Sequence, residues 1–158
     1  MKIAIISDVH DNTPYLRSFF AAEKFDILLI CGDIGNKDTL KEVAKSFSGK
    51  IYFVFGNADT FSKKDIPKNI INLGEAGIIE LAGKKIGLCH EPFKTKELLK
   101  NKPEIIFYGH THKPWIDKKG NTLLINPGTL GGIFLSSTYA IWDTSRPAPE
   151  LVRTNIIQ

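Results

Sequence analysis

Seven polar residues of metal-ligating type each follow a short apolar run that is typical of a buried strand. They are Asp8, His10, Asp33, Asn57, His90, His110 and His112. Four imidazoles, two carboxylates and one amide oxygen suit Mn, Fe, Co, Ni or Zn better than Ca or Mg. The set holds no cysteine, which argues against a structural zinc cage. The residue types therefore predict a site for transition-metal ions.

Taken singly, each of these residues has an ordinary explanation. An aspartate after a strand is usually a turn former or a helix N-cap, and a lone histidine is more often satisfied in the core than bound to metal. Asn57 in Gly-Asn-Ala-Asp is typical of a turn. All 4 histidines of the chain follow predicted strands, and this coincidence favours a shared site.

Two pairs of these residues are spaced two apart, in Asp8-Val9-His10 and His110-Thr111-His112. In extended backbone such residues point the same way, so each pair is predicted to hold one ion. Glycines precede Asp33, Asn57 and His110, and they allow tight turns and a close approach of the backbone.

The elements that must position these residues alternate in the first third of the chain. Apolar runs at 2–7, 27–31 and 51–55 predict strands. A helix is predicted after Thr13 as N-cap, with Pro14 at the first helical position. A second helix covers residues 40–47 and ends at Gly49. This β-α-β-α-β order predicts parallel strands, whose carboxyl ends are where open α/β sheets bind ligands.

Hairpins dominate after about residue 70. Strands are predicted at 78–81, 85–89, 104–108, 115–117, 122–126, 139–143 and 151–156, with a short helix at 96–100. Two sheets packed face to face, with helices on the outer faces, account for this order. The 158 residues are expected to form a single domain, 1–158.

Composition excludes several classes of protein. With 42% hydrophobic and 24% charged residues, the chain is neither disordered nor collagen-like. Cys31 and Cys89 are too few for a disulfide framework and are interpreted as inert buried thiols. Apolar runs such as 27–31 are far shorter than the roughly 20 residues of a spanning helix, and no signal-peptide pattern is present. We therefore expect a cytoplasmic protein without membrane contact.

The net charge of +4 fits an anionic ligand without requiring one. Lysines occur singly or in pairs with acids between them, which indicates a solvated surface and disfavours nucleic acid as a partner.

The order of the motifs resembles that of the calcineurin-like metallophosphoesterases. The motifs are Ser-Asp-Val-His (7–10), Gly-Asp (32–33), Gly-Asn-Ala-Asp (56–59), Cys-His (89–90) and Gly-His-Thr-His (109–112). The chain length and Asn-Pro-Gly-Thr at 126–129 are similar to the small prokaryotic phosphodiesterase branch. The resemblance covers about residues 1–145 and is specific because the motifs occur together.

The resemblance implies a four-layer α/β/β/α sandwich of two mixed sheets with a dinuclear metal site. By position, Asp8, His10 and His112 hold the first metal, Asn57, His90 and His110 hold the second, and Asp33 bridges them. Manganese is the first expectation, with Ni, Fe, Co or Zn as alternatives. A metal-bridging hydroxide is then expected to attack a phosphodiester in line, with Asp33 and Asn57 as catalytic residues and a small diester as substrate.

One position departs from the family. The usual motif is Gly-Asn-His-Asp or Gly-Asn-His-Glu, and this chain has Ala58 in place of the histidine. General acid catalysis is typically worth about 10²–10⁴-fold, so slow turnover and a preference for esters of acidic alcohols are predicted. Asp59 is then expected to be a turn residue. Asn12 is a candidate for a phosphate contact, with a role in helix entry as the alternative.

Other functions remain open at this point. The retromer-subunit relatives share this fold and act as protein-binding scaffolds, so a non-catalytic scaffold is the alternative from another class. A phosphomonoesterase is disfavoured by Ala58, and a nuclease by the lack of a dense basic stripe. The resemblance also suggests a homodimer or homotetramer.

Overall fold

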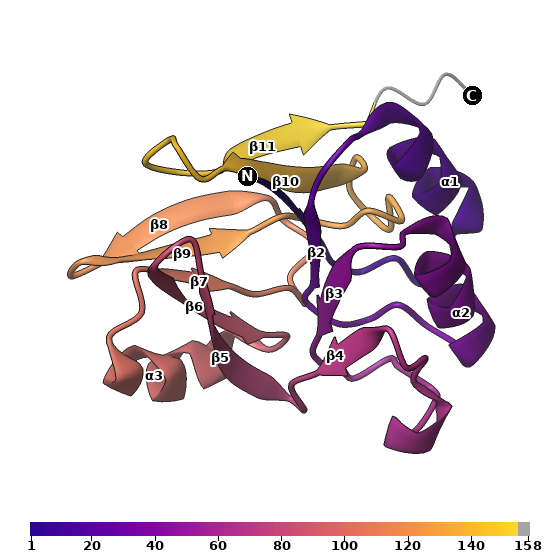
Figure 1. Cartoon of the computed structure of the whole chain (residues 1–158), viewed down its shortest axis with the longest axis horizontal. Coiled ribbons are helices and arrows are strands. Elements are labelled where there is room, and N and C mark those ends of the chain that lie inside the picture. The colour runs from indigo at the N-terminus through magenta and orange to yellow at the C-terminus, as the bar shows by residue number, and fades with distance from the viewer. Residues whose placement is uncertain (155–158) are drawn as a thin grey trace.

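The computed structural model describes residues 1–154. It contains two sheets packed face to face (Figure 1). The first sheet has six strands in the order β11-β10-β1-β2-β3-β4, and the second has five in the order β5-β6-β7-β9-β8. Both sheets mix parallel and antiparallel pairs. The predicted sandwich of two mixed sheets is confirmed.

The first sheet contains the predicted β-α-β-α-β segment. Its elements are β1 (Lys2–Ile6), α1 (Thr13–Ala22), β2 (Ile27–Ile30), α2 (Lys37–Ser46), β3 (Lys50–Phe53), β4 (Ile70–Asn72), β10 (Thr138–Asp143) and β11 (Glu150–Arg153). Strands β1 to β4 are parallel, and β10 pairs antiparallel with β1. The short edge strand β4 was not expected. Of the strand predicted at 151–156, residues 155 and 156 lie outside the described residues.

The second sheet holds the hairpins. Its strands are β5 (Ala76–Leu81), β6 (Lys84–Cys89), β7 (Ile105–Phe107), β8 (Trp115–Lys119) and β9 (Thr122–Asn126). Strands β6, β7 and β9 are parallel, and β5 and β8 add antiparallel edges. Ala82 and Gly83 both have positive φ between β5 and β6, as a tight hairpin turn requires.

Among the described residues, strand alternation divides the apolar core into two large clusters and a small third one around Cys89, Leu98 and Ile106. Ile3, Ile5 and Leu29 face the second sheet, where they pack with residues such as Leu88 and Phe107. The alternate residues of β1 and β2 face the two long helices, whose buried positions include Leu16, Phe19, Leu40 and Val43. The outer layer of the second sheet is thin, because it rests on the four-residue α3 (Thr95–Leu98) and its flanking 3-10 turns.

Helix ends differ slightly from expectation. Helix α1 begins at Thr13 itself, so Asn12 takes the N-cap position and Pro14 the second helical position. Helix α2 ends at Ser46, before the expected stop at Gly49. The shift at α1 lies within the residue or two to which sequence signals place a helix end, whereas α2 ends three residues before Gly49 because Phe47 is already extended.

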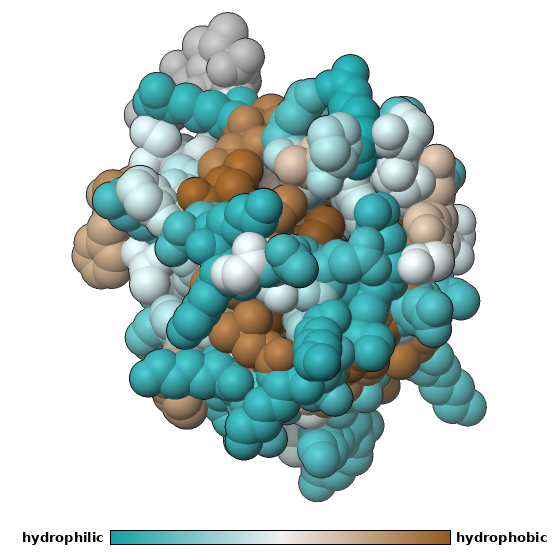
Figure 2. Space-filling view, turned by 90° about the vertical axis from the view of Figure 1, so that its left-hand side faces the viewer, coloured by the Kyte–Doolittle hydropathy of each residue, from teal (hydrophilic) through white to brown (hydrophobic). Residues whose placement is uncertain are grey.

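The end of the molecule that carries the β8–β9 turn is mainly hydrophilic, with apolar patches between polar side chains (Figure 2). Within residues 1–154, no helix is long and apolar enough to cross a membrane.

Candidate metal centre

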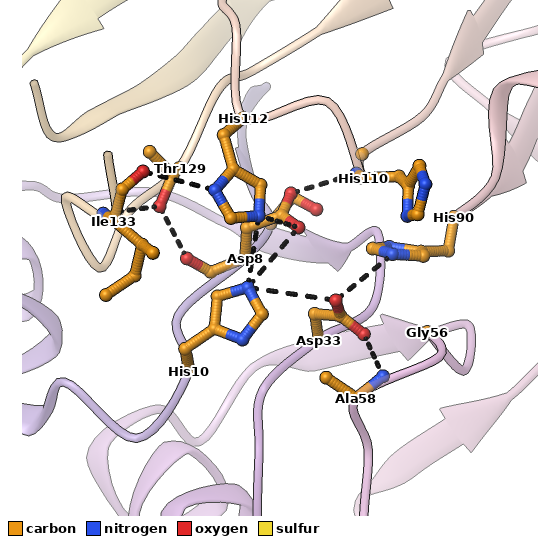
Figure 3. A network of polar contacts seen from close by, with 12 residues as sticks. Asp8, His10, Asp33, Gly56, Ala58, His90, His110, His112, Thr129 and Ile133 are labelled. Carbon is orange, nitrogen blue, oxygen red and sulfur yellow. Dashed lines mark hydrogen bonds and ion pairs between the residues drawn. The ribbon is translucent and has the colours of Figure 1, made fainter. Parts of the chain in front are cut away.

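The seven predicted residues lie together where five strands of the two sheets end. Figure 3 shows six of them, all but Asn57. They follow β1 (Asp8, His10), β2 (Asp33), β3 (Asn57), β6 (His90) and β7 (His110, His112). Asp8, Asp33 and His90 are almost fully buried, with exposed fractions of 0%, 2% and 1%. The remaining four are partly or fully open to solvent. The cluster therefore has a buried part, which contains both carboxylates and one imidazole, and a part that is accessible to solvent.

One group of donor atoms forms around Asp8. Its Oδ1 lies 3.2 Å from His112 Nε2 and 3.7 Å from His10 Nε2, and the two imidazole nitrogens are 3.2 Å apart. Asp8 Oδ1 is buried and has no hydrogen-bond partner among the described residues. A buried carboxylate oxygen without a donor is costly, and a cation between these three atoms would satisfy it.

A second group forms around the Asn57 amide. Its Oδ1 lies 3.1 Å from His90 Nε2 and 2.9 Å from His110 Nδ1. Asp33 lies between the two groups, because its Oδ2 is 3.2 Å from His90 Nε2 and 3.7 Å from His10 Nε2. One carboxylate oxygen thus faces an imidazole of each group (Figure 3).

Backbone carbonyls orient two of the imidazoles. His90 Nδ1 is 2.7 Å from the Cys31 carbonyl and His112 Nδ1 is 3.1 Å from the Ile133 carbonyl. A carbonyl oxygen only accepts, so in the neutral ring Nδ1 carries the proton and donates. The lone pair of Nε2 then points into the cluster, as in the second shell of known metal sites.

Contacts inside the cluster shift the pKa of His10, Asp33 and His90. The Asp8 carboxylate raises the pKa of His10 against the effect of burial. Burial lowers the pKa of His90, but Asp33 and Asp8 outweigh it and raise the value above the ordinary one. Burial raises the pKa of Asp33, and the His90 imidazole with the Ala58 N–H outweighs it, so this pKa lies below its usual range. Asp33 therefore stays ionised, and the raised pKa values of His10 and His90 favour positive charge on these two imidazoles.

The backbone around the ligand-type residues is left-handed rather than extended. Asp8, His10, Asp33, His110 and His112 all have φ between 48° and 71°. Asp8 and His10 converge through left-handed turns and not through extended backbone, so the expected reason was wrong. His110 and His112 also separate: His110 contacts Asn57, whereas His112 contacts Asp8. They belong to different groups of donor atoms, so the two side chains do not point to a common ion position.

Three glycines let the strand ends approach. A Cβ on Gly32, which has φ +87°, would lie 2.7 Å from Gly56 N and 2.8 Å from His90 Nδ1. A Cβ on Gly56 would lie 2.1 Å from Asp33 Oδ1, and one on Gly109 would lie 2.0 Å from Ser7 Oγ. The predicted close approach at these positions is confirmed.

Comparison with known proteins agrees with this geometry. The family model of the calcineurin-like phosphoesterase superfamily domain matches residues 1–146. The chain belongs to this superfamily. The matched region contains all seven clustered residues, and divalent metal ions are the cofactor class that the family implies. This phosphoesterase is accordingly a metal-dependent hydrolase.

Curated relatives of the phosphoesterase come from archaea. A phosphodiesterase of Methanocaldococcus jannaschii is 28% identical over an alignment of 159 residues. The alignment covers 92% of this chain and 95% of the relative. A probable metallophosphoesterase of the same organism is 32% identical over 145 residues, which cover 82% of this chain and 68% of the relative.

Solved structures share the fold of the phosphoesterase. A structure described as a novel archaeal phosphodiesterase matches with a TM-score of 0.84 at 24% identity, covering 98% of this chain and 100% of that one. Vps29 from Entamoeba histolytica, complexed with zinc, matches with a TM-score of 0.70 at 17% identity and covers 98% of both chains.

Asp59 has a larger role than the sequence indicated. Its Oδ2 accepts the N–H of Asp33 at 3.1 Å and of Gly56 at 2.7 Å, and its Oδ1 accepts the N–H of Gly35 at 3.1 Å. Burial raises the pKa of Asp59, while these N–H groups act in the opposite direction. Asp59 therefore joins the loop of Asp33 to the loop of Asn57. The expected turn role accounts for the bond to Gly56, three residues away, but not for the bonds to Asp33 and Gly35, which are distant in sequence.

Asn12 and Phe134 lie at the edge of the cluster region. Asn12 Nδ2 donates to the Gly131 carbonyl at 2.7 Å, so this amide N–H links the start of α1 to the loop after β9. A phosphate contact by Asn12 stays a prediction. Phe134 is 94% exposed, and its ring stacks on the His112 imidazole with centroids 5.9 Å apart.

Proposed function

We propose that this phosphoesterase hydrolyses phosphodiesters at a centre of two divalent metal ions. In this proposal Asp8, His10 and His112 hold one ion, Asn57, His90 and His110 hold the other, and Asp33 bridges them. The observation that supports this proposal most directly is the position of Asp33 Oδ2, which lies 3.2 Å from His90 Nε2 and 3.7 Å from His10 Nε2. A carboxylate between two imidazole groups is what a shared ligand requires.

The donor set supports transition-metal ions. Histidine nitrogens with carboxylate oxygens suit Mn, Fe, Co, Ni or Zn, and we propose manganese first. Bound ions of this kind polarise phosphoryl oxygens and make water a nucleophile near neutral pH. The orphaned Asp8 Oδ1 and the proton-bearing Nδ1 of His90 and His112 fit such ions because they leave acceptor atoms facing inward.

The residues around the centre limit which esters react well. Ala58 donates its N–H to Asp33 Oδ1 at 2.7 Å, so it holds Asp33 but brings no acid for the leaving group. All 4 histidines of the chain lie in the cluster. Without a general acid, the reaction lacks a rate enhancement of about 10²–10⁴-fold. Esters of acidic alcohols are therefore the favoured substrates.

The test starts from metal-stripped protein. Calorimetric titration with Mn²⁺, Ni²⁺, Zn²⁺ or Mg²⁺ counts the bound ions, and hydrolysis of bis(p-nitrophenyl) phosphate is compared with that of p-nitrophenyl phosphate. We expect two ions per chain and a preference for the diester, with both binding steps weakened in Asp33→Asn. A single ion, or full activity in Asp33→Asn, contradicts the dinuclear proposal. Preference for the monoester contradicts the diester proposal.

The likeness to Vps29 at TM-scores of 0.66 and 0.70 supports a second candidate, a protein-binding scaffold. A chain that binds two ions and cleaves neither ester would favour that function. The complete set of seven ligand-type side chains favours the enzyme.

A further inference from the structure

A cavity of about 280 Å³ opens directly beside the metal centre. Its lining includes Asn57 and His90 of the cluster together with Phe55, Glu75, Phe93 and Lys94. Asn57 and His90 are two of the proposed ligands, so a phosphate held at the centre projects any group on this side into the cavity. The volume lies near the lower end of the range for small-ligand sites, about 300–1,000 Å³, and is suited to a single ring.

An open aromatic ring lies at this cavity. Phe93 is 61% exposed and belongs to a 3-10 turn, Pro92–Lys94, directly before α3. Lys94 Nζ lies 5.6 Å from the centre of the Phe93 ring, yet most of the side chain stays in water. A large apolar side chain at a pocket beside a reactive centre offers a surface on which a planar group can stack.

Charge at the cavity argues against an anionic occupant. The lining has one lysine, Lys94, which forms an ion pair with Glu75. Glu91 is a further acid of the lining, which thus has two carboxylates and one lysine. The Lys94 ammonium is already partnered, and a second phosphate or carboxylate would meet uncompensated negative charge. An uncharged group meets no such penalty.

We propose that this cavity receives one ester group of the phosphodiester substrate, that the group is an uncharged aromatic ring, and that Phe93 determines this preference. The inference rests on the proposed phosphodiesterase function for its substrate. It adds the identity of one ester group, which the metal centre alone leaves undefined.

Two substrates with a common leaving group test the proposal. Bis(p-nitrophenyl) phosphate and methyl p-nitrophenyl phosphate both release p-nitrophenolate and differ in the second ester group. We expect the ratio of their kcat/KM values, aryl over methyl, to fall about fivefold to tenfold in Phe93→Ala. Phe93→Leu keeps apolar volume without a ring and should give an intermediate ratio. Trp115→Ala, which removes a 50% exposed aromatic side chain outside the cavity lining, should leave the ratio unchanged.

A binding measurement separates this inference from the proposed function. Calorimetry on metal-loaded protein compares phenylphosphonate with methylphosphonate, neither of which can be hydrolysed. We expect phenylphosphonate to bind about fivefold to tenfold more tightly, and Phe93→Ala to remove the difference. Equal binding of the two by the unchanged protein, or an unaltered preference in Phe93→Ala, overturns the inference. Absence of hydrolysis together with a Phe93-dependent preference contradicts only the diesterase proposal.

Discussion

The carboxylate of Asp59 accepts the backbone N–H of Asp33 at 3.1 Å, so one acid fixes the loop that carries another. The same Asp59 oxygen accepts the N–H of Gly56 at 2.7 Å, directly before Asn57. Two loops from neighbouring strands are thus tied at one atom. The distance between the proposed bridging ligand and the proposed amide ligand depends on this link.

Asp59→Asn should loosen the centre without removing a ligand. An amide oxygen is a weaker acceptor than a carboxylate, and its NH₂ group would face backbone donors. We expect a loss of about 1–3 kcal/mol in unfolding free energy and weaker binding of metal ions, measured by urea unfolding and calorimetric titration. Asp143→Asn is the matched control, because Asp143 accepts hydrogen bonds from Ser145 at an exposed turn. Metal binding equal to that of the control would contradict the role of Asp59.

Gly32→Ala should cost much more than Gly120→Ala, although both glycines have positive φ, at +87° and +62°. Alanine in left-handed backbone costs about 1–2 kcal/mol at either position. Gly120 has open space around a new Cβ, whereas at Gly32 the Cβ would press on the Gly56 backbone. Urea unfolding should show about 1–2 kcal/mol for Gly120→Ala and a clearly larger loss, with weaker metal binding, for Gly32→Ala. Equal losses would show that the loops separate freely.

The two cysteine thiols should make the fold sensitive to alkali. Burial raises the pKa of Cys89 to about 12 and that of Cys31 well above its ordinary value, against about 8.5 in an unfolded chain. Below pH 8.5 both states keep their protons. Above it the unfolded state releases them first, so each thiol lowers stability by up to about 1.4 kcal/mol per pH unit.

Cys89→Ala tests this contribution. Its own packing loss is the same at every pH, so the change in unfolding free energy between pH 8 and pH 10 isolates the thiol. We expect a smaller change in the variant than in the unchanged protein. Parallel pH profiles would mean that Cys89 ionises as easily in the folded chain.

Glu75→Gln should reduce the discrimination against charged ester groups. The substitution releases Lys94 from its ion pair, so the ammonium becomes available to an anion in the cavity. We expect binding of 4-carboxyphenylphosphonate to improve about fivefold relative to phenylphosphonate, measured by calorimetry on metal-loaded protein. Glu80→Gln changes charge equally at an exposed position of β5 and should have no effect. An unchanged ratio in Glu75→Gln would show that the Glu75–Lys94 ion pair does not govern charge selection.

The gathering of the seven ligand-type residues could be predicted from sequence because they follow strands. Local apolar runs identify strands, and parallel strands gather their carboxyl ends, so Asp8, Asp33 and His90 were expected at one place. The conformation of the turns was not accessible, because the enrichment of Asp and His in left-handed backbone is too small to locate it at His110 and His112. The three-residue β4 is too short for a periodic pattern.

Features made by distant segments escaped prediction for a related reason. Asp59 contacts a residue 26 positions away, and Glu75 meets Lys94 across a separation of 19. Neither pairing has a local pattern, because it arises only when loops of different strands come together. The cavity beside Asn57 was not predicted for the same reason, because its lining comes from segments that are distant in sequence.

Left-handed backbone at five of the seven clustered residues has an evolutionary consequence. Each non-glycine residue in that conformation costs about 1–2 kcal/mol, and glycine would remove most of the cost. Selection for stability alone would therefore favour glycine at His10 and His110, whereas Asp8 and Asp33 also accept the backbone N–H of His110 and Ala58. A descendant that keeps only the scaffold would thus lose the histidines before the two aspartates.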